Sequence, residues 1–340
     1  MRCFKRPITI TIRYEDTNNG IITREVVQRI FNNPNQTIVI KVIIGEGILE
    51  ISYNAFQDCP NIEAVITPDS LEVIGYRAFA NFEKLKVFNF GQNLRKIEVG
   101  AFENCRILET VDLSLCTILK GLNERVFYGC ESLTKVILPP NLQTIDSCLF
   151  YGCRSLREIA IPDSVTKLGH NVFNGCRNLT TMYANERRYG VLFFPESLES
   201  IGDRCFVHCR FLHTVIFHNG IGNIELGNNI FYNCPNLEYV LLPKSVRPHD
   251  LFPVDETPRY VFSSEPNPEC DAFIQEQLES KRIKDKFRSQ KQEFSECLNP
   301  KLRHPLSYSI IMSYMSYYNN TIEDNMEYSR YHRIVETILS

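Results

Sequence analysis

The chain has 340 residues, of which 44% are hydrophobic and 23% are charged, a balance that is typical of globular proteins. A formal net charge of −3 and a pI near 6.2 argue against nucleic acid as a partner. The longest candidate for membrane insertion, residues 306–318, has only 13 residues and is too short to span a bilayer. Residues 1–15 also lack the apolar run and cleavage site of a secretory signal. We therefore expect a cytoplasmic protein with no membrane span.

Residues 1–25 are expected to form an amino-terminal cap. Residues 8–14 alternate apolar and polar side chains, which favours a strand or a hairpin. Thr23 stands where a helix N-cap would be, ahead of an apolar pattern that reaches Phe31. Phe31 also begins a degenerate repeat, with its strand expected near residues 37–43.

A Phe followed three residues later by Cys, or by a residue in its place, recurs along the chain. These phenylalanines, which we expect in the core, are Phe56, Phe79, Phe102, Phe127, Phe150, Phe173, Phe206 and Phe231. The steps between them are 23, 23, 25, 23, 23, 33 and 25 residues. Leucine-rich repeats have periods of about 20 to 29 residues, and each unit adds one strand to a parallel sheet. The spacing predicts an α/β solenoid over residues 26–247, with eight full repeats and the parallel sheet on its concave face.

The pattern L-x-x-I-x-[IL]-P followed by L-x-x-I-G-x-x-A-F-x-x-C is clearest in residues 66–79 and 153–176. It resembles the BspA-like class of leucine-rich repeat proteins over roughly residues 26–247. The resemblance implies a binding scaffold and does not indicate the partner.

Seven of the thirteen cysteines occupy one column of the repeat: Cys59, Cys105, Cys130, Cys153, Cys176, Cys209 and Cys234. We expect them to be free, buried thiols in a reducing compartment. The N-glycosylation sequons at Asn35, Asn178 and Asn319 are then incidental. The alternative is a cell-surface, adhesin-like protein that is exported by an unrecognised route and carries glycans there.

The best candidates for metal ligands are Cys205, His208, Cys209, His213 and His218. In the repeat pattern both thiols face the core and His213 faces outward, so they do not converge on one ion. The chain also has no recognisable catalytic motif. We predict no catalytic residue, no metal and no cofactor, and a thiol or zinc enzyme is the less favoured alternative.

Three irregular segments complete the chain. About ten extra residues between 182 and 198 predict an exposed loop at 185–194, either a tolerated insertion or a contributor to recognition. Prolines make residues 248–269 a linker or a cap. Residues 270–340 are predicted as a helical tail that either caps the solenoid or covers its concave face, and the first helix spans 270–298.

Side chains alternate along a strand, so the sequence also predicts which positions of the sheet point outward. The apolar and aromatic candidates for binding another protein there are Ile66, Ile137, Tyr183, Ile216, Tyr239 and Leu241. Strand propensity alone is a competing explanation for such residues. We expect a non-enzymatic, intracellular scaffold that binds another protein on its concave sheet.

Overall fold

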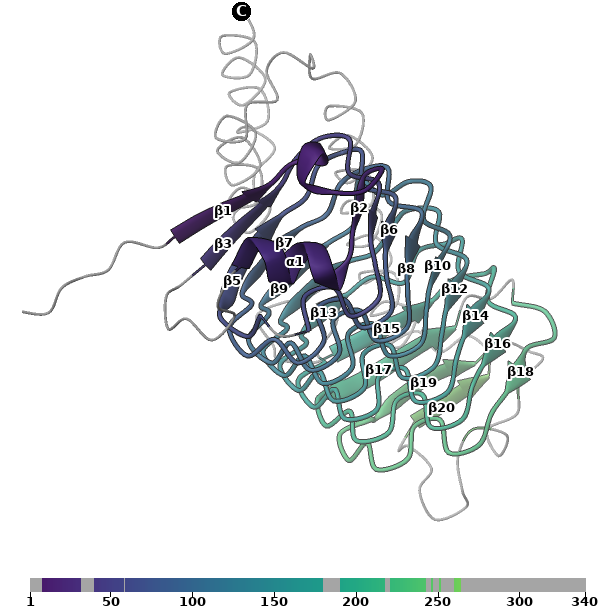
Figure 1. Ribbon diagram of the computed structural model, residues 1–340. Helices are drawn as coiled ribbons and strands as arrows, with labels where there is room; N and C mark the ends of the chain where they lie inside the picture. The colour runs from purple at the N-terminus through teal and green to yellow at the C-terminus, as the bar shows by residue number, and fades with distance from the viewer. Residues whose placement is uncertain are drawn as a thin grey trace, which may run out of the picture. The chain divides into compact units, whose positions relative to one another are not determined.

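A computed structural model of the protein describes residues 8–31, 40–57, 59–179, 190–217, 221–242, 246, 251 and 260–263. The chain divides into two compact units, Met1–Lys281 and Arg282–Ser340. All of the described residues belong to the first unit, which is drawn in colour in Figure 1. The predicted helical tail at 270–340 lies outside them.

The amino-terminal elements form the first rung of the stack. They are β1 (Ile8–Ile12), the 3₁₀ turn η1 (Tyr14–Asp16), β2 (Ile21–Ile22) and α1 (Arg24–Phe31). Strand β1 runs parallel to β3 (Ile40–Ile44), so the opening strand does not form a hairpin. The hydroxyl of Thr23 accepts the N–H of Val26 at 3.4 Å and caps α1 as expected. Phe31 then packs edge-on against Phe56 of the next rung.

After α1 the same structural unit, called a rung here, is repeated along the chain. Each rung contributes one strand to each of two rows of parallel strands (Figure 1). After β3, the first row holds β5 (Ile62–Ile66), β7 (Val87–Asn89), β9 (Thr110–Asp112), β11 (Lys135–Ile137), β13 (Glu158–Ile159), β15 (Gly190–Phe194), β17 (Leu212–Phe217), β19 (Tyr239–Leu242) and β20 (Tyr260–Ser263). After β2, the second row holds β4 (Glu50–Ile51), β6 (Val73–Ile74), β8 (Lys96–Ile97), β10 (Gly121–Leu122), β12 (Thr144–Ile145), β14 (Lys167–Leu168), β16 (Ser200–Ile201) and β18 (Glu225–Leu226). The fold is therefore a parallel β-solenoid of leucine-rich repeat type with little helix.

The eight phenylalanines predicted for the core all lie in it and form one continuous stack. Each is at most 3% exposed, and neighbouring ring centroids are 4.9 to 5.8 Å apart with nearly parallel planes. Because one ring comes from each repeat, the stack joins every rung to the next.

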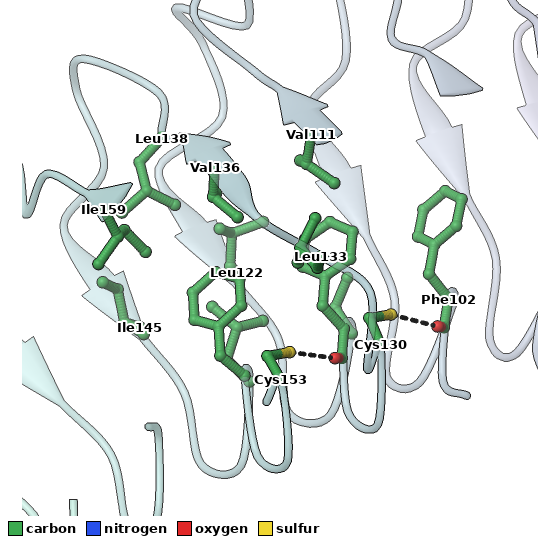
Figure 2. Close-up of a cluster of buried hydrophobic side chains, with 14 of the residues drawn as sticks. Phe102, Val111, Leu122, Cys130, Leu133, Val136, Leu138, Ile145, Cys153 and Ile159 are labelled. Carbon is green, nitrogen blue, oxygen red and sulfur yellow. Dashed lines mark hydrogen bonds between the residues drawn. The ribbon is translucent and has the colours of Figure 1, made fainter. Parts of the chain in front are cut away.

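The column cysteines are more than small apolar side chains. Six of their thiols donate hydrogen bonds of 3.0 to 3.3 Å to the Phe carbonyl of the preceding rung: Cys105, Cys130, Cys153, Cys176, Cys209 and Cys234. Figure 2 shows two of these bonds, from Cys130 and Cys153. Cys116, which belongs to no column of the repeat, is also buried and donates to the carbonyl of Gly91 at 3.4 Å.

The loop side of each rung, where the F-x-x-C segment turns, is also hydrogen-bonded to its neighbour. In the rung of Phe127, the N–H groups of Arg125, Phe127 and Gly129 donate to carbonyls of the following rung at 2.8 to 3.1 Å. Arg125 and Gly129 both have positive φ, 58° and 69°, and this left-handed pair makes the turn. Each rung therefore directs three backbone donors toward the next one.

The extra residues of the sixth full repeat come before its strand, β15, and do not come after it. In β15, Leu192 pairs with the core residue Val215, and Phe193 pairs with Ile216. The prediction of a loop over 185–194 is therefore wrong for residues 190–194, which are strand.

The first row of strands also extends past residue 247, where the sequence pattern ends. Strand β20 pairs in parallel with β19, and Phe262 is the partner of Leu241. The described part of the 248–269 segment therefore adds one more strand to the row.

Candidate functional site on the sheet face

The sheet face is the set of side chains in the first row of strands that point away from the core. Its alternation is clear in β7, where Val87 and Asn89 are exposed and Phe88 between them is buried. Strands β9 and β11 follow the same alternation, with their central valines in the core. The period-two pattern thus fixes which residues a partner can reach.

The amino-terminal half of this face, on β5 to β11, is open to solvent. It consists of Ala64, Ile66, Val87, Asn89, Thr110, Asp112, Lys135 and Ile137. Val87 is 49% exposed, although its strand β7 lies between β5 and β9. Ile66 and Ile137 are half-buried, and polar side chains stand between these aliphatic groups.

The carboxy-terminal half of the face, on β13 to β19, is closed by comparison. Its outward residues whose side chains the structure describes are Ala160, Phe193, Thr214, Ile216 and Leu241. Phe193 and Ile216 are each only 4% exposed, and Leu241 is half-buried. Ile216 was predicted to be an exposed binding residue, and its burial corrects that prediction.

The remaining predicted binding residues divide between the two halves. Ile66 and Ile137 lie on the open half, and Leu241 lies on the closed one. Tyr239 is the backbone partner of Thr214 in β19, and nothing is described of its side chain. Tyr183 lies outside the described residues.

Phe193 occupies the outward-facing position of the sheet that the sequence pattern assigned to Tyr183. Phe193 was not identified from the sequence. The strand was placed by counting residues forward from Cys176, which ignores the insertion before the strand. Counting residues back from Phe206 places the strand correctly. Pro195 follows the strand at the same distance from its Phe as Pro162 does in the preceding repeat. This proline was the signal that locates the strand.

The candidate metal ligands do not converge. Cys209 donates its thiol hydrogen to the carbonyl of Phe173, inside the core. Outside the core, His213 Nε2 lies 3.0 Å from Glu238 Oε2, and His208 Nδ1 lies 2.8 Å from the amide nitrogen of Asn233. His218 lies outside the described residues. Within the described ranges no three His, Cys, Asp or Glu side chains form a cluster that could hold a metal ion.

The buried thiols are poor nucleophiles. Burial raises the pKa of Cys105 to about 12, and burial followed by the charges of Asp112 and Asp69 raises the pKa of Cys116 to about 12. All ten described cysteines are free thiols. A nucleophilic cysteine needs a lowered pKa and access to solvent, and the buried columns provide neither.

The strongest charged cluster lies on the loop side and spans three rungs. The buried carboxylate of Glu103 contacts Arg77 at 3.0 Å through one oxygen and Arg125 at 2.6 Å through the other. The Arg125 guanidinium in turn lies over the ring of Tyr128. Because both carboxylate oxygens already have cationic partners, this cluster fastens neighbouring rungs together and is not an open site.

The stacked parallel rungs and their column of phenylalanines define a leucine-rich repeat protein. A family model described as BspA type leucine rich repeat region, in 6 copies, matches residues 23–120, 49–180 and 181–252. These matches together cover more than half of the chain, and the chain belongs to this family. The resemblance seen in the sequence is therefore confirmed.

Solved structures of similar proteins come from several bacteria. A leucine-rich repeat protein from Bacteroides ovatus is 26% identical, with a TM-score of 0.46, over 60% of this chain and 55% of that one. A leucine rich cell surface protein from Faecalibacterium prausnitzii is 23% identical, with a TM-score of 0.43, over 64% of each chain. The chain thus spans less than two thirds of the length of either protein. A search of curated proteins finds no match.

In the part of the chain that the structure describes, no helix is both long enough and apolar enough to cross a bilayer.

Proposed function

We propose that this protein is a non-enzymatic scaffold that binds another protein on the amino-terminal half of its sheet face. The observation that carries the proposal is the exposure of Val87 on β7, which is 49%. Ile66 on the neighbouring strand β5 and Ile137 on β11 also point away from the core. Aliphatic groups set among polar ones in this way suit the centre of a protein interface.

The polar members of this half give the surface a means of selecting its partner. Asp112 is paired in register with Ile137, and Thr110 is paired with Lys135, so carboxylate and ammonium groups stand beside the aliphatic ones. Charges at such positions orient a partner and disfavour wrong ones. The preferred partner therefore carries an apolar group for Val87 and charges that complement Asp112 and Lys135.

A binding role is favoured over catalysis because the reactive side chains of the described rungs are already engaged. The column thiols donate to backbone carbonyls, as in Cys153 to Phe127 at 3.2 Å, and His213 is held by Glu238. Catalytic groups instead converge on open space where a substrate fits.

We propose further that the protein works in the cytoplasm. The ten free thiols among the described cysteines support this location, since thiols placed one per rung are best preserved in a reducing compartment. The alternative location, at the cell surface, predicts a glycan on Asn178. Mass spectrometry of the native protein separates the two, because the cytoplasmic protein has neither disulfides nor mass removed by glycosidase.

The binding proposal is tested with the full chain as bait in chemical cross-linking and affinity capture from native lysate. Val87→Asp with Ile137→Asp places two charges in the aliphatic part of the open half, and we expect loss of the specifically captured protein. Tyr53→Asp with Tyr76→Asp is the matched control, because these side chains are 70% and 45% exposed but lie outside the sheet face. Equal capture by both double variants would show that the sheet face is not the binding surface.

A further inference from the structure

The first strand of the first row, β1, has an open edge (Figure 1). Among the described strands it pairs only with β3, and it stands at the end of the order β1-β3-β5-β7. The carbonyl of Ile12 accepts the N–H of Gly45 at 2.8 Å, so the backbone groups of Ile12 are directed toward the following rung. Because these groups alternate in direction along a strand, those of Thr9 and Thr11 are directed toward the open edge.

The sequence of β1 lacks the charge, proline or bulge that usually protects such an edge. Its residues are Ile-Thr-Ile-Thr-Ile, and its ladder with β3 is continuous, with no shift of register. Proteins whose edge strands must stay unpaired usually place one of those three features there. β-branched residues also favour the extended conformation that pairing requires. The edge of β1 is therefore suited to receive another strand.

We propose that this edge pairs with the same edge of a second copy of the chain, antiparallel to it, about a two-fold axis at Ile10. The sequence of β1 reads the same in both directions. In this register Ile10 lies opposite Ile10 of the second copy, Thr9 lies opposite Thr11, and Ile8 lies opposite Ile12. Every position thus meets a residue of its own type. A two-fold interface requires a surface that is complementary to itself, and β1 has this property.

The direction of the backbone groups selects the register. In an antiparallel ladder, pairs of residues that exchange both of their N–H···O bonds alternate with pairs that exchange none. The outward groups of Thr9 and Thr11 fall on the hydrogen-bonded pairs, and Ile10 falls on the pair between them. A shift of one residue would place these outward groups opposite groups that already bond to β3. The register centred on Ile10 therefore satisfies the donors and acceptors of both threonines.

The apolar face of the strand gains burial in the same arrangement. Ile12 is fully buried, whereas Ile10 packs against the core but is only partly buried. Residues directly opposite each other in an antiparallel pair lie on one face of the sheet and contact each other. The two Ile10 side chains therefore meet on the core side and cover the amino-terminal end of both cores. The exposed side chains of Thr9 and Thr11 stay on the sheet face.

The pairing also sets the direction of the two binding surfaces, a consequence that rests on the proposed function. Because opposite residues share a face, the open halves of both sheet faces lie on the same side of the joined row. Seven strand steps, about 34 Å along the row, separate β7 of one copy from β7 of the other. A partner with two binding segments can then engage both copies. The pairing is tested with no partner, so its failure and that of the proposed function are distinguishable.

Sedimentation equilibrium of the full chain tests the association. We expect a dimer, with twice the 39.4 kDa mass of one chain, that dissociates on dilution. Thr11→Pro removes an N–H that points away from β3, at a position where an edge strand tolerates proline, and should weaken the dimer at least tenfold. Thr11→Val is the matched control, because it keeps the N–H and the β-branched shape, and should leave the dimer unchanged. A monomer at every concentration, or equal association of the two variants, overturns the proposal.

Disulfide trapping in the full chain tests the register with no proline. Ile10→Cys places two thiols opposite each other in a pair whose Cα atoms are about 4.5 Å apart, within the range of a disulfide. Oxidation should link two chains through residue 10, as mass spectrometry of the linked peptide will show. Thr9→Cys is the matched control, because residue 9 lies two positions away from its counterpart and should not form this link. A link from residue 10 to another cysteine of the same chain, no link at all, or equal linking by the control overturns the proposal in favour of a different occupant of the edge.

Discussion

The loop side and the sheet face of the same rungs follow opposite rules. On the loop side, one Phe and a thiol or its substitute recur at fixed positions, and left-handed residues hold the turn on either side of the Phe. On the sheet face the residue changes at almost every step, from Val87 to Thr110 to Lys135. The Phe and Cys side chains are buried between neighbouring rungs, whereas the side chains on the open half of the sheet face point into solvent. Stability is therefore concentrated in the loop-side columns, and specificity is left to the sheet face.

The largest effect should come from breaking the aromatic stack. Phe150→Ala removes a ring that contacts Phe127 and Phe173, and we expect a loss of about 3 to 5 kcal/mol in the free energy of unfolding. Chemical denaturation measures this loss, with Tyr53→Ala as the exposed aromatic control. A shift no larger than that of the control would show that the stack does not carry the stability of the rungs.

A smaller loss should follow removal of the charge that fastens three rungs. Glu103→Ala leaves Arg77 and Arg125 without their shared carboxylate, and we expect a cost of about 2 kcal/mol, because charge-assisted hydrogen bonds are lost from a buried group. The control is Glu72→Ala, which breaks the exposed pair with Arg95 and should cost less than about 1 kcal/mol. Equal costs for the two variants would contradict the special role of the cluster.

The buried thiols predict a decline in stability at alkaline pH. Folding raises the pKa of Cys105 and of Cys116 from the model-compound value of 9.0 to about 12, mainly through burial. The stabilisation is fully present below pH 9.0 and is lost as the pH rises toward 12, because only the unfolded chain ionises these thiols in that window. Each thiol should account for about 1 kcal/mol by roughly pH 10.

The pH prediction is checked by denaturation at a series of pH values. The double variant Cys105→Ala, Cys116→Ala starts with lower stability but should lose less of it between neutral and alkaline pH. Parallel pH profiles for this variant and the unmodified protein would show that these thiols are not the groups responsible.

The smallest effect on stability is expected on the open half of the sheet face. Val87→Asp replaces a half-exposed side chain that points away from the core, so the free energy of unfolding should change by less than about 0.5 kcal/mol. Chemical denaturation and partner capture are measured on the same variant. This variant should lose capture and keep its stability, which distinguishes the role of the sheet face from that of the loop side. A loss of several kcal/mol would mean that the sheet face also carries the fold.

The periodic features of the fold were predicted from the sequence. Features that depend on segments distant in the sequence were not. The Phe and Cys columns follow from spacing alone, because every rung repeats the same contacts. The position of Phe193 was also present in the sequence, through Pro195, but a forward count from Cys176 missed it. The burial of Ile216 was not predicted, because alternation along a strand indicates the direction of a side chain and not its exposure. The hydrogen bonds of the thiols were also missed, since apolar periodicity does not distinguish a donor from a methyl group.

The directed hydrogen bonds between rungs have a consequence for synthesis. Synthesis proceeds from the amino terminus, so the residues of the Phe127 rung leave the ribosome before those of the Phe150 rung. The Phe127 rung then presents the N–H groups of Arg125, Phe127 and Gly129, whose acceptors lie on the rung still to be made. The arriving rung supplies those carbonyls and returns the thiol of Cys153 to the carbonyl of Phe127. Each rung thus presents the hydrogen-bond donors onto which the next rung packs. The solenoid is extended in this way toward its carboxy terminus, one rung at a time.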